Sequence, residues 1–413
     1  MLPGPLALVF LIVFLDLLGV GILIPVIPQL LGNPASPFYL LPEGWSVERG
    51  YVLLGALVTV FPLMQFLATP ILGELSDKFG RRPLLLISIA GTCVAYLLFG
   101  LGILARNIPL LFGARALDGI TGGNIAVAQA VISDTTAPQD RAKSFGLIGA
   151  AFGLGFIMGP YLGGKLSDPA VVSWFDAATP FWFAALLSLV NVVLVAALLP
   201  ETNLTPKTEH RINWRKSAQN INHAWALAPL RPLYATNFLF QSGFSFFTTF
   251  FGVFLINRFG FTQGNIGDFF AYVGLWIVFT QAVVVRRASR RFAEPSILRA
   301  SIVPAGLAVL LYLVPRAWWG LLLVVPLFAM AVGLTQANLT ALLSRSASAR
   351  IQGEVLGINA SVQALAQTFP PLLAGLLAGV VSPEAPLMAA ASLMILAGLC
   401  FHACYRPVRE PAA

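Results

Sequence analysis

Long runs of hydrophobic residues alternate with short polar loops along almost the whole chain. A helix needs about 20 consecutive apolar residues to cross the hydrocarbon core of a membrane, and Pro, Gly and charged residues divide the sequence into twelve runs of this kind. The pattern therefore predicts membrane-spanning helices in two sets of six. The first set covers 5–31, 49–72, 83–105, 109–133, 144–166 and 178–199, and the second covers 233–257, 265–285, 297–314, 318–342, 354–380 and 385–405.

One longer polar stretch separates the two sets of helices. It predicts a cytoplasmic linker over 201–232, between an N-terminal six-helix bundle (1–200) and a C-terminal six-helix bundle (233–413). A weak internal repeat supports this division, because GITGGN at 119–124 is similar to GLTQAN at 333–338. Parallel repeats of this kind place substrate sites near the membrane midplane, between the two halves. The predicted fold is an all-α membrane protein with twelve transmembrane helices.

Composition narrows the class of protein. Hydrophobic residues make up 58% of the 413 residues and charged residues only 10%, against about 25% charged in a soluble domain. A soluble enzyme, a disordered chain and a disulfide scaffold are therefore excluded. The sequence shows no nucleophile–base pair, phosphate loop or metal-ligand set, so we expect neither an enzyme nor a cofactor or metal site.

The distribution of basic residues predicts how the chain lies in the membrane. With the N-terminus in the cytoplasm, eighteen of the 25 Lys and Arg residues fall in cytoplasmic loops, linker and tail, five fall outside, and Arg115 and Arg299 lie within spans. This bias follows the positive-inside rule and places both termini in the cytoplasm. The net charge of +8 then reflects membrane topology, and we expect no nucleic-acid partner.

The loop after the second span carries the most specific motif. It reads GELSDKFGRRP over 73–83, and its glycines permit a sharp turn between two helix ends that carry charges. The loop resembles motif A of the major facilitator superfamily in its spacing, position and predicted side of the membrane. The resemblance implies a charge network that holds the two halves closed on the inside, with Asp134 as the acidic partner at the end of the fourth span. Its residues are Gly73, Asp77, Gly80, Arg81, Arg82 and Asp134.

The fifth span is rich in glycine. Small residues with a proline are typical of a close helix-packing face with a kink. The span also resembles motif C, which is characteristic of drug/proton antiporters within the superfamily, and this implies that the helix presses closely on the second half to make an outer seal. The motif residues are Gly149, Gly153, Gly159, Pro160, Gly163 and Gly164.

Three charged residues lie inside the first set of spans. Asp16 begins a segment, 16–28, that is similar to an antiporter pattern of the first helix, and an ionised Asp near the bilayer centre costs about 2.5–3.5 kcal/mol. Arg115 and Asp118 share one face of the fourth span. We predict that these three residues form a proton-coupling cluster. Two structural alternatives remain open: Asp16 caps a break in the first helix, and Arg115 and Asp118 form a static ion pair within the fourth span.

Polar and aromatic side chains suggest where cargo binds. The seventh span is rich in Phe with amides between, and most of these rings are expected to pack or to face lipid. An apolar cavity with a few amides would still suit a bulky amphipathic molecule. The predicted substrate-binding residues are Asn124, Asn237, Gln241, Phe244, Phe247, Gln281, Gln336 and Asn338.

Over nearly the whole chain, the resemblance is to the tetracycline/proton antiporter branch of the family. Three characteristic ionisable positions of that branch fall here on Ala95 and near Ile277 and Ala305, so tetracycline itself is not implied as the substrate. We expect a monomeric, proton-coupled exporter of small hydrophobic or amphipathic compounds in the bacterial inner membrane, with protons and the lipid bilayer as its other partners. A metabolite symporter or facilitator, and a non-transporting sensor on the same fold, are the alternatives.

Overall fold

The computed structural model describes residues 4–136, 141–203, 219, 222, 230–346 and 352–406. Most of the predicted linker, 201–232, lies outside these residues. The described chain is built from helices, and nine of them are long and apolar enough to cross a membrane, so the chain is a multi-pass membrane protein. The full number of twelve spans stays a prediction.

The chain divides into two compact units. Unit 1 comprises Met1–Lys216 and Gly260–Ala271, and unit 2 comprises Ser217–Phe259 and Tyr272–Ala413. The division lies close to the predicted boundary between two bundles, except that the first half of one later helix packs with unit 1.

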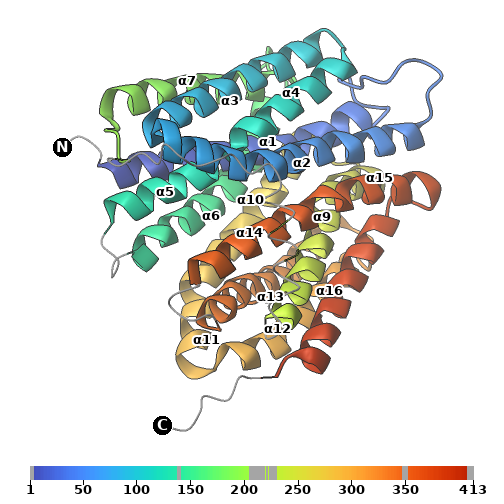
Figure 1. The fold of residues 1–413 in the computed structure, drawn as a ribbon. Coiled ribbons are helices and arrows are strands. Elements are labelled where there is room, and N and C mark those ends of the chain that lie inside the picture. The colour runs from blue at the N-terminus through green and yellow to red at the C-terminus, as the bar shows by residue number, and fades with distance from the viewer. Residues whose placement is uncertain are drawn as a thin grey trace, which may run out of the picture. The chain divides into compact units, whose positions relative to one another are not determined.

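The helices of unit 1 run in blue and green in Figure 1. They follow the predicted spans closely at most boundaries. They are α1 (Pro5–Leu31), α2 (Val47–Phe79), α3 (Arg81–Leu104), α4 (Ile108–Thr121), η1 (Gly122–Asn124), α5 (Ile125–Thr135), α6 (Arg141–Leu166) and α7 (Thr179–Leu198).

The helices of unit 2 run from yellow-green to red in Figure 1. They are α9 (Arg231–Phe259), the part of α10 (Gln263–Phe279) that follows Ala271, the π-helix η3 (Thr280–Val285), α11 (Arg286–Arg291), α12 (Glu294–Leu311), α13 (Trp318–Arg345), α14 (Gln352–Thr368), α15 (Pro370–Val380) and α16 (Ala385–Cys404).

Two spans predicted as continuous helices are interrupted, and a third, 265–285, ends in the π-helix Thr280–Val285. The span 109–133 passes through a short 3₁₀ turn at Gly122–Asn124, where two consecutive glycines weaken the α-helix. The span 354–380 breaks at Phe369, because Pro370 and Pro371 cannot donate backbone hydrogen bonds to the preceding turn. The sequence periodicity located both segments correctly but did not reveal these breaks.

Each unit has its own apolar core. In unit 1, buried aliphatic side chains from α1, α3, α5 and α7 form one cluster, which includes Ile12, Leu85 and Val131. In unit 2, the rings of Phe247, Phe251, Tyr312 and Phe328 pack with centroids 4.5 to 5.8 Å apart. The phenylalanines of α9 therefore supply much of the core of unit 2.

Candidate functional site

An ion pair lies buried at the centre of unit 1. The Nη1 of Arg115 is 2.8 Å from Oδ2 of Asp118, and the two residues are only 4% and 5% exposed. The Arg115 guanidinium also lies 4.5 Å above the ring of Phe61. The cation is therefore held both by a carboxylate one helical turn away and by an aromatic face.

Asp16 joins this pair from α1. Asp118 is close enough to Asp16 for their carboxyl groups to interact electrostatically, and the side-chain amide of Asn124 lies beside Asp16. Asp16 keeps some accessible surface. Its Oδ2 atom is nevertheless buried and lacks a hydrogen-bond partner among the described residues, as do both polar side-chain atoms of Asn124. The three predicted residues thus lie together, with hydrogen-bonding capacity left unused.

Tyr96 is a member of this cluster that the sequence did not indicate. Its hydroxyl interacts electrostatically with Asp16, Asp118 and Arg115, and a methyl group on Gly19 would collide with that hydroxyl. Gly19 therefore leaves the room in α1 that Tyr96 fills. A tyrosine in an apolar span carries no sequence signal for this role.

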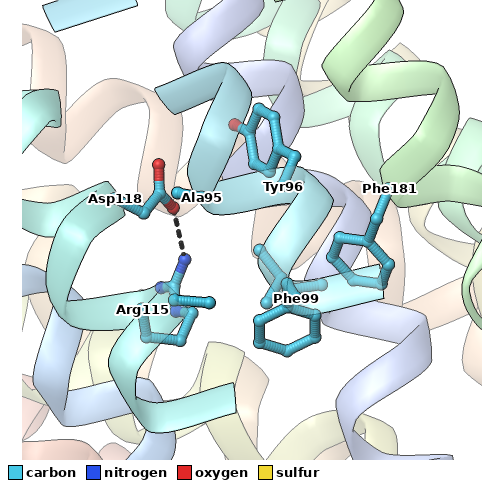
Figure 2. A pocket seen from close by; sticks show the side chains of 8 residues that line it. Ala95, Tyr96, Phe99, Arg115, Asp118 and Phe181 are labelled. Atoms are coloured by element: carbon cyan, nitrogen blue, oxygen red, sulfur yellow. Dashed lines mark hydrogen bonds and ion pairs between the residues drawn. The ribbon is translucent and has the colours of Figure 1, made fainter. Parts of the chain in front are cut away.

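A narrow pocket borders the ion pair, and Tyr96, Arg115 and Asp118 are among the residues that line it. Figure 2 shows Tyr96, Phe99 and Phe181 beside Arg115 and Asp118. The pocket has no room for even a water molecule, whereas pockets that bind drug-sized ligands have volumes of about 300–1,000 Å³. The pocket is therefore too small for such a ligand.

The second charge network lies at the turn between α2 and α3. Arg81 pairs with Asp77 at 2.5 Å and with Asp134 at 3.1 Å, and its Nη1 donates to the Ser76 hydroxyl at 2.6 Å. The structure thus joins the predicted residues Asp77, Arg81 and Asp134. Gly80 connects the helices with a φ of 102°, a left-handed conformation that favours glycine.

Arg82 and Gly73 have simpler surroundings. Arg82 donates through Nη2 to the carbonyl of Ala196 in α7. Arg82 therefore links the start of α3 to α7. A methyl group built on Gly73 would lie 3.8 Å from the Cβ of Ala126, which is an ordinary van der Waals contact.

Glu201 completes this network, although it was not among the residues predicted for the network. Its carboxylate accepts hydrogen bonds from the backbone N–H groups of Arg81 at 2.9 Å, Arg82 at 3.1 Å and Asn203 at 2.8 Å. Partial burial opposes ionisation, but these backbone donors outweigh it and hold the pKa of Glu201 below its ordinary value. The N-cap residue of α3 is Gly80, which has no side chain to offer, so Glu201 caps the helix from 120 residues away.

Asn203 fixes the same segment on the other side of the turn. Its Nδ2 donates to the carbonyls of Asp77 at 2.8 Å and Ser76 at 3.3 Å, near the end of α2. Residues 201–203, where the predicted linker begins, are therefore bound to both helices of the motif.

The glycines of α6 permit backbone-to-backbone packing. Methyl groups built on Gly155, Gly159 and Gly163 would lie 2.5 to 2.7 Å from atoms of α1. A methyl on Gly164 would lie 2.6 Å from the carbonyl of Gln263, at the start of α10. The resemblance to motif C implied that its glycines press on the second half of the chain; of these, Gly159 and Gly163 pack on α1, and Gly164 packs on the start of α10.

The remaining motif C residues differ from this group. Gly153 faces open space within 4 Å among the described residues, and Pro160 lies inside α6 with its Cδ 2.8 Å from the position of a methyl on Gly21. Gly149 also lies in α6, in a stretch whose side-chain surroundings are outside the described part.

The predicted cargo residues of unit 2 fall into two groups. Asn237, Phe247 and Asn338 are buried: Asn237 donates to Asn359, Phe247 lies in the aromatic cluster, and Asn338 donates to the carbonyl of Leu334 in its own helix. The side chains with accessible surface are those of Gln241, Phe244, Gln281 and Gln336. Gln281 lies in the π-helix η3, and π-turns inside α-helices often occur at functional sites.

An all-helical membrane chain with a buried charge cluster and a charged turn between α2 and α3 has the construction of a secondary transporter. Comparison with known proteins agrees: residues 9–371 match the family model described as Major Facilitator Superfamily. The chain belongs to this superfamily, and it is therefore a membrane transporter and not an enzyme.

The relatives are transport and resistance proteins. The class D tetracycline resistance protein of Salmonella ordonez is 32% identical, over 90% of this chain and 88% of its own length. Multidrug resistance protein 1 of Bacillus subtilis (strain 168) is 28% identical, over 88% and 87%. The crystal structure of a D-xylose-proton symporter shares the fold with a TM-score of 0.77, at 15% identity and with 97% of each chain covered.

Proposed function

We propose that the protein is a proton-coupled exporter of small hydrophobic or amphipathic compounds, working by alternating access in the bacterial inner membrane with both termini in the cytoplasm. The observation that carries the proposal is Asp16, whose Oδ2 is buried beside the Arg115–Asp118 pair and has no hydrogen-bond partner in the part of the chain that the structure describes. The similarity to proteins named for tetracycline and multidrug resistance supports export as the direction.

The arrangement provides a place where a proton can be gained and lost. Asp118 is held by Arg115, so Asp16 is the carboxyl with an oxygen still available. Its neighbour Asn124 can donate to an ionised carboxylate or accept from a neutral carboxyl group, because an amide offers both functions. Asp16 can therefore exchange its proton while its partners stay in place, and a change of charge at this point alters the interaction with Asp118.

Cargo binding would use accessible side chains. Gln241, Phe244, Gln281 and Gln336 combine amides with an aromatic ring, and this chemistry suits an amphipathic molecule better than a sugar with many hydroxyl groups. The buried residues Asn237, Phe247 and Asn338 would then support the shape of the site without contacting cargo.

The test is proton movement in proteoliposomes that contain the purified protein and a pH-sensitive dye. Amphipathic drugs added to the wild type should release protons, and Asp16→Asn should abolish the signal because an amide cannot carry the proton. Glu43→Gln removes a carboxylate from an exposed loop and should leave the signal intact. Drug-driven proton release that survives in Asp16→Asn would refute the role of Asp16.

The direction of transport separates export from symport. Under an imposed pH gradient, an exporter moves drug against the inward flow of protons, whereas a symporter for a sugar or organic acid moves its cargo with them. Accumulation of a metabolite together with protons, without any response to drugs, would refute the proposed function.

A further inference from the structure

A groove opens on unit 2 where α12 ends and α13 begins. Its volume is about 450 Å³, which is within the range of about 300–1,000 Å³ for sites that bind small molecules. Its walls are almost entirely apolar, and Arg316 is the charged residue that lines it. The lining residues used below are Leu311, Val314, Pro315, Arg316, Trp319 and Leu323.

The walls of the groove are exposed on the surface of unit 2. Val314 is 69% exposed and Leu323 is 72% exposed, so apolar walls of this membrane protein are open to the surrounding hydrocarbon. Trp318 and Trp319 are also exposed at the start of α13. Tryptophan is enriched where the hydrocarbon meets the headgroups, so this end of the helices lies at the membrane interface.

Two arginines lie at the polar end of the groove. Arg316 is exposed and lines it, and Arg258, at the end of α9, donates through Nη2 to the carbonyl of Pro315 at 3.2 Å. Pro315 is itself a wall of the groove, so both guanidinium groups are close to its rim. Guanidinium groups bind phosphate through paired N–H donors.

We propose that this groove binds an anionic phospholipid, with an acyl chain along Leu311, Val314 and Leu323 and the phosphate on Arg316 and Arg258. An apolar channel open to hydrocarbon fits a lipid chain, and two cations at its interfacial end fit a negatively charged headgroup. The Lys/Arg distribution predicts that this end faces outward, so the lipid comes from the outer leaflet of the membrane. This site is independent of the proposed transport activity.

The experiment uses the purified full-length protein and phosphatidylglycerol that carries a photoreactive group in its acyl chain. After irradiation, peptide mapping should find the label on the segment 311–324. Phosphatidylcholine with the same reactive chain should label this segment much less, because its headgroup has no net charge. Equal labelling by the two lipids would mean ordinary lipid contact only and would overturn the proposal.

Variants test the part played by the two arginines. A basic residue near the surface contributes about a fivefold gain in anionic-lipid binding, so Arg258→Gln with Arg316→Gln should weaken labelling of the segment by about 25-fold. The matched control is Arg290→Gln with Arg291→Gln, which removes the same charge from the end of α11. An equal loss in both pairs would show a general effect of charge and would overturn the proposal.

A third variant tests the apolar wall. Leu323→Gln places an amide in the groove but keeps Arg258 and Arg316. It should reduce labelling of 311–324 by phosphatidylglycerol, because the acyl chain would lose an apolar contact. Because Leu323 is exposed, the substitution should leave the fold intact, which gel filtration checks. Undiminished labelling would exclude this groove as the acyl site.

Discussion

The cap on α3 gives the sharpest quantitative test of the network at the turn between α2 and α3. Replacing Glu201 by Ala removes the acceptor of three backbone hydrogen bonds, from Arg81, Arg82 and Asn203. Loss of an N-cap costs about 0.5–2 kcal/mol, and bonds to a charged acceptor are at the strong end of the scale. Because Glu201 is only partly buried and water can replace part of its role, we expect a loss of about 2 kcal/mol in the local opening free energy.

Hydrogen exchange measures this opening directly. Every 1.4 kcal/mol changes an equilibrium tenfold, so amides in the first turn of α3 should exchange about 30-fold faster in Glu201→Ala than in the wild type. Glu201→Gln, which keeps one acceptor oxygen but loses the charge, should give a smaller increase. The matched control is Glu384→Ala, because Glu384 stands at the N-cap of α16 without a side-chain cap hydrogen bond.

The pH dependence has a defined sign. The pKa of Glu201 is lowered in the folded protein from an ordinary value of 4.5, so its contribution is fully present above pH 4.5. That contribution is lost as the pH falls through the lowered pKa. The exchange ratio of variant to wild type should therefore approach one in acid. A ratio near one at neutral pH, or an equal effect of Glu384→Ala on α3, would refute the reasoning.

Three further outcomes follow from the packing of unit 1. Gly159→Ala should abolish transport and lower thermal stability, because its methyl group would lie 2.7 Å from the backbone of α1. Gly153→Ala should be tolerated, because Gly153 faces open space among the described residues. Equal behaviour of the two variants in a transport assay would contradict this prediction. Asp118→Asn should destabilise the protein by about 3–5 kcal/mol, because it leaves the buried Arg115 unpaired. The double variant with Arg115→Met should recover part of the lost stability in a thermal-unfolding assay. A double variant as unstable as the single one would show that the broken ion pair is not the cause. Gly80→Ala should lower stability by about 1 kcal/mol or more in the same assay because its φ is 102°, and an unchanged midpoint would argue against strain at this turn.

Much of the fold could be predicted because long apolar runs in the sequence identify membrane helices. The predicted span 5–31 coincides with α1, and 178–199 differs from α7 by one residue at each end. The grouping of Asp77 with Arg81 could also be predicted, because both belong to one short motif. Their pairing needs only a turn between two helices.

The parts that could not be predicted depend on contacts between residues far apart in the chain. Glu201 meets Arg81 across 120 positions, and a glutamate after a span has many possible partners. Tyr96 belongs to the charge cluster only because α1 leaves space at Gly19. Phe247 is of a residue type that often contacts ligands, yet its ring packs inside an aromatic core. Hydropathy does not distinguish a ring that faces cargo from one that faces its neighbours.

The glycine contacts between α1 and α6 have a mechanical consequence. Where Gly21 meets Gly159, and Ile22 meets Gly163, the two backbones touch without an intervening side chain that could bend or change rotamer. We therefore expect α1 and α6 to move together as one rigid body. Asp16 lies near the middle of α1, and Lys165, which pairs with Asp268, lies at the end of α6. A displacement of α1 that begins at Asp16 would be carried along α6 to that ion pair with little loss.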